Sequence, residues 1–249
     1  MRSFLKLAST DIRLFIREPI AVFFTIAFAP LLVVLSGVIF GNAPSALSGG
    51  LGAMDIAMPA YAAMVLCIVG FMSIPVSICG YRESGVLRRF RSTPLRPVTF
   101  IAADVVSNLL MAFVGVLAGV LAGLIFYHTA FEGSILIVGI AIAFCALSMF
   151  SIGYLIAALA PTPRIANVVG LLILYPMMFL SGIFTPPEVM PETVRRISQF
   201  LPLKYAVDLL RGLWFGKPWS DFMLATAVLL GVLVVCTALA ARFFRWESS

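Results

Sequence analysis

Residues 105–131 read VVSNLLMAFVGVLAGVLAGLIFYHTAF, a run without Asp, Glu, Lys or Arg and with the lone His128 near its end. A helix needs about 20 apolar residues to cross the hydrocarbon core of a bilayer, and this run is long enough. Lipid offers the backbone no hydrogen-bond partner, and the run lacks the alternation of a barrel strand. It is therefore predicted to be a transmembrane helix.

Five other intervals of the chain are equally free of charge. Of the 249 residues, 62% are hydrophobic and 11% are charged, whereas soluble domains carry about 25% charged residues. A soluble core of this size could not cover so much apolar surface. We therefore predict an all-α membrane protein, a single transmembrane domain over residues 1–249. Its six predicted transmembrane helices are 20–40, 58–80, 102–127, 134–159, 165–185 and 222–242.

The distribution of Lys and Arg predicts the orientation, because these residues collect on the cytoplasmic side of a membrane. Lys and Arg concentrate in the N-terminal segment, in loop 81–97 and in the C-terminal tail. The first and third loops have no Lys or Arg, and their only charged residues are Asp55 and Glu132. We expect the protein to lie in the plasma or inner membrane of the cell, with both termini in the cytoplasm. Segment 186–217 is also basic, although it is predicted to be external. We expect short re-entrant helices there; the alternative is five spans and a surface helix.

The N-terminal segment 1–18 has the pattern of an amphipathic helix. Lys6, Arg13 and Arg17 fall on one face and apolar residues fall on the other. Such a helix lies in the membrane interface rather than crossing the bilayer. It is either an anchor that only sets orientation or an element that also touches a cytosolic partner.

The loop 81–97 reads YRESGVLRRFRSTPLRP and is the most informative polar stretch. It follows a predicted span and closes on Pro94 and Pro97, which stop a helix. Between these ends, apolar and arginine side chains alternate at helical spacing. This predicts a short basic helix that presses apolar side chains into a cytosolic protein. The alternative is a positive-inside determinant without a partner.

This loop resembles the coupling loop of ABC transporter permeases of the type-2 exporter family, which includes daunorubicin-resistance and multidrug-resistance permeases. The order Arg82-Glu83-Ser84-Gly85, a short helix and then Ser92-Thr93-Pro94 matches those loops. A second stretch, LSGIFTPPE at 180–188 followed by FLPL at 200–203, resembles the family's segment after its fifth span. Together the matches extend over nearly the whole chain.

The resemblance implies a permease that exports a hydrophobic or amphipathic small molecule, such as a drug, an antibiotic or a lipid-like compound. It also implies two copies of a separate P-loop ATPase subunit, which would bind ATP and Mg, and a second permease copy in a homodimer. Segment 1–18 would be the connecting helix of this assembly. The residues that would couple the chain to the ATPase are Arg82, Glu83, Gly85, Val86, Leu87, Arg88, Phe90 and Arg91.

Residues for the substrate path are harder to identify from the sequence. Met and Phe side chains adapt to varied apolar shapes, although each is also an ordinary core or lipid-facing residue. The predicted path residues are Phe24, Phe28, Met64, Phe71, Met72, Asn167, Leu174 and Met178. Polar residues inside spans mark pathways when they face a cavity, and these are Asp104, Asn108, Ser148, Ser151, Tyr154, Asn167 and Tyr175. The segment after the fifth span is either a plug or an external gate, with Phe184, Pro186 and Pro187 as its gate residues.

Several other function classes find no support in the sequence. There is no G-x-x-x-x-G-K-[ST] motif, so we predict no ATPase activity, no catalytic residue and no bound cofactor in this chain. The four cysteines form no CxxC pair, which predicts no metal site. Topology accounts for the net charge of +6, and no nucleic-acid partner is expected. A stand-alone secondary carrier or channel remains the alternative; a membrane enzyme or scaffold is a third.

Gly115, Gly119 and Gly123 lie four residues apart in the third predicted span. Small residues at this spacing let two helices approach closely. We predict that they pack against other helices of the same chain, with a seam between two copies as the alternative.

Overall fold

The structure is a computed structural model that describes residues 17, 19–44, 50–86, 97–183 and 191–243. Helices make up this part of the chain, and it contains no strand. Six of them are long and apolar enough to cross a membrane: Phe23–Phe40, Ala53–Glu83, Thr99–Tyr127, Ile135–Leu159, Pro163–Leu180 and Trp219–Phe243. The predicted all-α membrane fold with six spans is confirmed, and the arrangement with five spans is not adopted.

The spans are built from the following elements. The first comprises α2 (Pro19–Val22), the π-helical turn η1 (Phe23–Ala27) and α3 (Phe28–Phe40), and the second comprises α4 (Ala53–Ile68), the π-helical turn η3 (Val69–Ser73) and α5 (Ile74–Glu83). The third to fifth are α7 (Pro97–Tyr127), α8 (Ile135–Leu159) and α9 (Pro163–Leu180). Two short helices follow, α10 (Glu192–Ser198) and α11 (Pro202–Trp214), before η5 (Trp219–Phe222) and α12 (Met223–Phe243).

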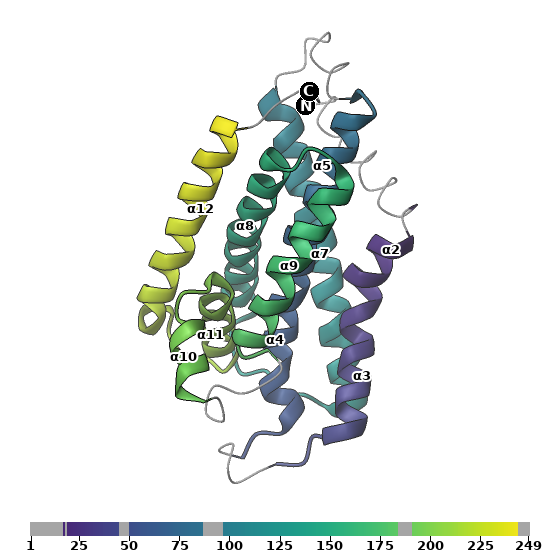
Figure 1. The fold of residues 1–249 in the computed structure, drawn as a ribbon. Coiled ribbons are helices and arrows are strands. Elements are labelled where there is room, and N and C mark those ends of the chain that lie inside the picture. Colours follow the sequence, from purple (N-terminus) through teal and green to yellow (C-terminus); the bar gives the residue numbers. More distant parts are fainter. Residues whose placement is uncertain (1–16, 18, 45–49, 87–96, 184–190, 244–249) are drawn as a thin grey trace.

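The spans run side by side as one bundle (Figure 1). The ends of α5 and α12 lie at one end of the bundle, and α10 and α11 lie at the other end, near the start of α4 (Figure 1). We call these two ends the Arg82 end and the Trp214 end.

The second span is the centre of the bundle and the sixth lies at its edge. In an 18-residue apolar stretch of the second span 78% of the residues are buried, against 11% in the corresponding stretch of the sixth span. The second span packs on α3, α7, α8, α9 and α11, whereas α12 packs mainly on α8 and α11. A helix that is apolar on all sides suits either environment. Neighbouring helices alone therefore decide which apolar faces contact protein and which contact lipid.

The three glycines of the third span pack inside the chain, as predicted. A Cβ atom on Gly115 would collide with the backbone oxygen of Thr25, and one on Gly119 would lie 3.4 Å from the Cβ of Ala29. These glycines thus let α7 approach the first span closely, which excludes them from a seam between two copies.

A second glycine contact joins η3 to α8 and α9. A Cβ on Gly153 would collide with the carbonyl oxygen of Gly70, and one on Gly170 would collide with that of Phe71. The backbones of three spans therefore touch here without intervening side chains, as small residues permit in membrane bundles. A displacement of α8 or α9 must move the second span as well.

At the Trp214 end, a hydrogen-bond network centred on Asp55 ties the connections between helices together. The buried Asp55 carboxylate accepts hydrogen bonds from the backbone N–H groups of Gly52 at 2.8 Å and Ala130 at 2.9 Å and from the Asn42 amide at 3.2 Å. The Asn42 side chain in turn accepts from the first-turn N–H of Met54 at 3.0 Å. It thereby caps the helix start, where N–H groups lack intrahelical partners.

Helix α11 completes this end. The Trp214 indole N–H donates to the carbonyl of Ala130 at 3.0 Å, and the Trp214 carbonyl accepts from the N–H groups of Glu132 and Gly133 at 3.2 and 2.9 Å. Its apolar face, with Leu203 and Leu210 fully buried, packs on α4, α8, α9 and α12. Short helices are therefore present where re-entrant helices were predicted, and α11 covers the end of the bundle.

Candidate coupling site at the Arg82 end

The second span ends in a sharp turn where loop 81–97 begins. The Ser84 backbone N–H and its hydroxyl both donate to the carbonyl of Gly80, at 2.9 and 2.8 Å, which closes the last turn of α5. Gly85 has a φ of 71°, the left-handed conformation that glycine adopts without steric cost and that commonly ends helices. Helical backbone resumes at Val86. Gly85 thus ends the second span.

Arg82 is held inside the bundle. Its side chain is 6% exposed, and its Nη2 donates to the carbonyl oxygen of Ala160 and lies 3.2 Å from the Sγ of Cys79. Ala160 is the C-terminal cap of α8. Carbonyls at a helix C-terminus lack intrahelical donors, and a cation there also interacts favourably with the helix dipole. Arg82 therefore fastens the root of the loop to the turn between α8 and α9.

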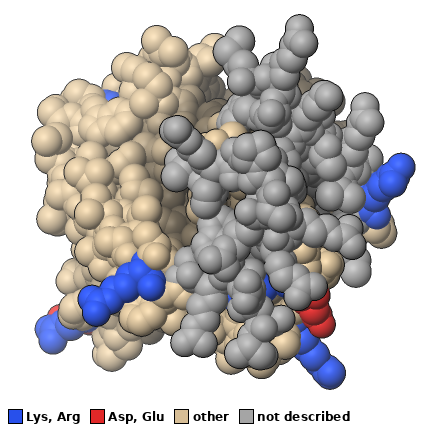
Figure 2. All heavy atoms as spheres, turned by 90° about the horizontal axis from the view of Figure 1, so that it is seen from above, with Lys and Arg blue, Asp and Glu red and all other residues tan. Residues whose placement is uncertain are grey.

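Further contacts join the start of α7, which follows the loop, to α5 and α8. The Tyr81 ring meets the Phe100 ring edge-on, with centroids 6.0 Å apart, and so links α5 to the first turn of α7. The Tyr154 hydroxyl donates to the buried Asp104 carboxylate at 2.5 Å, which links α7 to α8. Both roots of the loop thus rest on one group of packed helices. Figure 2 looks onto this end, where most visible Lys and Arg lie towards the margin of the bundle.

The predicted coupling residues fall into three groups. Arg82 points inward, is buried and bonds to Ala160 of the same chain. Glu83 is exposed, and Gly85 and Val86 are half-buried. Leu87, Arg88, Phe90 and Arg91 lie outside the described residues, as do Lys6 and Arg13 of the N-terminal segment. Arg17 is exposed.

The predicted path residues differ in burial. Met64, Phe71, Leu174 and Met178 are buried in the core, while Phe24, Phe28 and Met72 are partly buried and Asn167 is exposed. The predicted gate residues Phe184, Pro186 and Pro187 lie outside the described part of the chain.

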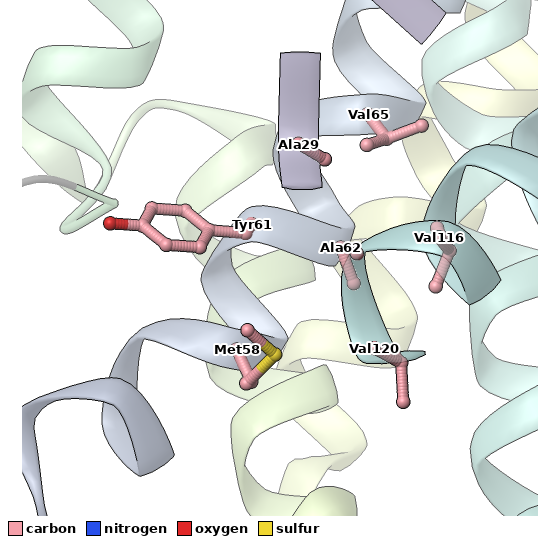
Figure 3. Close-up of a pocket in the computed structure, with 8 residues that line it drawn as sticks. Ala29, Met58, Tyr61, Ala62, Val65, Val116 and Val120 are labelled. Carbon is pink, nitrogen blue, oxygen red and sulfur yellow. The ribbon is translucent and has the colours of Figure 1, made fainter. Parts of the chain in front are cut away.

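One enclosed pocket lies between α3, α4 and α7 and is lined by small and medium apolar residues, among them Met58, Ala62 and Val116 (Figure 3). Its volume is about 10 Å³, which is close to the minimum for a single water molecule. None of the predicted path residues lines it. This pocket cannot hold a drug-sized molecule.

A larger groove of about 230 Å³ lies between α7, α8 and α12. Ser151 and Tyr154, two of the polar span residues singled out by the sequence, line it. Its apolar lining, including Ile101 and Leu233, could not be identified from the sequence, because an apolar residue facing a groove looks the same as one facing lipid. The described residues contain no group of three or more His, Cys, Asp or Glu side chains placed to hold a metal ion.

Comparison with known proteins gives a family and several relatives. The ABC-2 type transporter family matches residues 2–215. The chain is 30% identical over 167 residues to the daunorubicin resistance ABC transporter permease protein DrrB1 of Streptomyces coeruleorubidus, a match that covers 66% of this chain and 59% of that protein.

Two more distant matches come from other bacteria. Nodulation protein J of Rhizobium leguminosarum bv. viciae is 33% identical over 104 residues, which covers 42% of this chain and 40% of that protein. The probable multidrug ABC transporter permease YbhR of Escherichia coli (strain K12) is 23% identical over 184 residues, 74% of this chain and 50% of that protein. The chain thus spans about half the length of the relatives it matches.

Proposed function

Because the chain belongs to the ABC-2 type transporter family, we propose that it is the membrane-spanning permease of an exporter driven by a separate ATPase subunit, which acts on the Arg82 end. The cargo we propose is a hydrophobic or amphipathic small molecule. The names of the relatives, which include a daunorubicin-resistance permease and a probable multidrug permease, support this class of cargo.

The observation that carries the proposal is the bond between Arg82 and the C-terminal carbonyl of α8. A hydrogen bond from a charged donor contributes about 1.5 to 3 kcal/mol and has defined geometry. A push on the loop would therefore be transmitted to α8 and α9 instead of bending a free segment. From there the glycine contacts at Gly70, Gly153 and Gly170 would carry the displacement to the second span.

The distribution of charge supports a cytoplasmic Arg82 end. Arg82, Arg164 and Arg242 are at or near this end, whereas the first and third loops, at the other end, hold no Lys or Arg. Apart from the basic segment that contains α10 and α11, this distribution follows the positive-inside rule. Both termini would then be cytoplasmic, and α10 and α11 external.

The basic residues on the proposed external side are partly neutralised by neighbouring acids. Lys204 pairs with Asp208 at 2.5 Å, and Arg196 pairs with Glu192 at 2.6 Å. Each pair spans one turn of a helix, a spacing at which opposite charges stabilise a helix. Segment 186–217 is basic although we propose that it is external, and these pairs give two of its basic residues a role in stabilising α10 and α11.

The remaining parts of the assembly follow from the family. We propose a homodimer of this chain with two copies of a P-loop ATPase that bind ATP and Mg. The path would run between the two permeases. Exposed Asn167 of α9 and the partly exposed Phe24 and Phe28 of the first span would face this path.

The test is transport by inverted membrane vesicles that contain this chain with or without its ATPase subunit. We expect ATP-dependent uptake of a fluorescent amphipathic dye only when both are present, and no uptake when the P-loop lysine of the ATPase is replaced. Dye uptake by the chain alone, driven by an ion gradient, would contradict the proposal and favour a secondary carrier.

A further inference from the structure

The groove between α7, α8 and α12 opens on the side of the bundle that has the least protein cover. Its walls include Ile101 and Val105 of α7, Phe150 of α8 and Leu233 of α12. The sixth span forms the outer wall, and 11% of the residues in its 18-residue apolar stretch are buried. The groove therefore faces the bilayer and not the interior of the bundle.

The groove is somewhat shorter than one leaflet of a membrane. On α12 its lining runs from Leu233 to Ala241, about 12 Å at 1.5 Å per residue. On α8 it runs from Leu147 to Tyr154, about 10.5 Å on the same scale. The hydrocarbon core of a bilayer is about 30 Å thick, so each leaflet supplies about 15 Å. A ligand that fills the groove thus extends over most of one leaflet.

The polarity of the groove changes along its length. Leu147, Phe150 and Leu233 form its deep part, and the hydroxyl-bearing Tyr154 and Thr237 lie closer to the Arg82 end. The hydroxyls of Ser151 and Tyr154 already donate hydrogen bonds, to the carbonyl of Ser148 at 2.7 Å and to Asp104 at 2.5 Å. Water would gain little in the deep part, because apolar cavities stay dry. An apolar chain suits the deep part, and an ester group suits the level of Thr237.

A cation follows the outer end of the groove along α12. Ala240 and Ala241 line its outer end, and the exposed Arg242 follows them in the last turn of α12. The long arginine side chain can extend from a helix end to the headgroup layer. A cation at that level attracts an anionic phosphate.

We propose that the groove binds one membrane phospholipid, with an acyl chain between α7, α8 and α12, an ester carbonyl near Thr237 and the phosphate beside Arg242. The apolar groove within one leaflet, its change in polarity and the arginine that follows its outer end correspond to the three parts of that molecule. The bound lipid would fill the space under α12 and join the sixth span to the bundle. The proposal requires only that the chain spans a membrane, and it does not depend on ATP-driven transport.

The test is native mass spectrometry of the purified full-length chain, titrated with phosphatidylglycerol in detergent. Ala241→Phe places a ring in the groove, and Ala238→Phe makes the same change at an exposed residue of α12 that does not line it. Ala241 lines the outer end of the groove, so the ring would occupy space that the ester and phosphate end of the lipid needs. We expect a loss of phosphatidylglycerol retention for Ala241→Phe, a smaller loss for Ala241→Leu and none for Ala238→Phe.

A second variant tests the headgroup. Arg242→Gln should reduce the preference for phosphatidylglycerol over phosphatidylcholine by about fivefold, the contribution of one cation near the surface, and should leave the retention of either lipid measurable. Thermal unfolding in the same detergent identifies any variant that has lost its fold, and the graded Leu variant then serves in place of Phe.

Equal lipid retention by the wild-type chain and folded Ala241 variants would overturn the proposal. So would a loss of dye transport in Ala241→Phe without any change in lipid retention, because that result would make the groove a cargo site. The retention measurement uses no ATPase, so its outcome is independent of whether the proposed transport function holds.

Discussion

The two ends of the bundle are held together in different ways. At the Trp214 end, Asp55, Asn42 and Trp214 connect three segments through several hydrogen bonds, many of them to backbone groups. At the Arg82 end, the described contacts join side chains of the spans: Arg82 bonds to the end of α8, Tyr81 packs on Phe100, and Tyr154 donates to Asp104. The difference suits a protein that keeps one end closed while its other end receives a push.

The strongest test of this difference is to remove the centre of the Trp214 network. Asp55→Ala deletes the acceptor of three hydrogen bonds and leaves buried N–H groups unpaired, so we expect the free energy of unfolding to fall by about 4 kcal/mol. Denaturant unfolding in detergent micelles measures this change. The exposed Asp221 is the matched control, and Asp221→Ala should change stability by less than about 0.5 kcal/mol. Equal effects of the two variants would show that the network does not hold this end.

The Arg82 end should respond in transport rather than mainly in stability. Arg82→Ala should lower the dye transported per ATP hydrolysed about tenfold, within the range of typical coupling energies, because the loop loses its bond to α8. Arg82→Lys keeps one donor and should restore part of the coupling. The measurement is the ratio of dye uptake to phosphate release in reconstituted vesicles.

Arg164→Ala is the control for Arg82, because Arg164 lies exposed in the first turn of α9 at the same end. Its transport ratio should equal that of the wild type. If Arg82→Ala lowers ATP hydrolysis and transport in proportion, Arg82 supports the fold but does not transmit force.

Two glycines of α5 and its turn should respond with opposite signs. Gly85→Ala forces a side chain into the left-handed region and should destabilise the protein by about 1 kcal/mol. Gly80→Ala lies inside the helix with no atom within 4 Å of the added Cβ, and should be neutral or stabilising by up to about 1 kcal/mol. Thermal unfolding of both variants checks the sign. A stabilising Gly85→Ala would contradict the turn described for the start of the loop.

The smallest effect is expected for the ion pair on α10. The side chains of Glu192 and Arg196 are 67% and 76% exposed, so Glu192→Gln should change stability by less than about 0.5 kcal/mol, and less still at high salt. Asp208→Asn breaks a less exposed pair on α11 and should cost more. If Glu192→Gln lowered stability more than Asp55→Ala, ion pairs rather than the Asp55 network would dominate the stability of the Trp214 end.

The sequence predicted the spans well because a lipid-exposed segment must be both long and nearly free of charge. It also placed Gly115 and Gly119 correctly inside the chain. It did not show that Arg82 points inward, because the partner of Arg82, Ala160, is 78 residues away. Nor did it show that Met64 and Phe71 are enclosed in the core of a single chain.

Composition alone determined that this chain is a multi-pass helical membrane protein, since backbone polar groups and charges cannot be left unpaired in hydrocarbon. The resemblance carried by loop 81–97 indicated the family, and residues 2–215 match it. Only the tertiary structure decided which apolar faces meet protein, where the groove beside α12 opens and what Arg82 binds. These features depend on packing between distant segments, and apolar side chains carry no mark in the sequence that separates a protein neighbour from a lipid one.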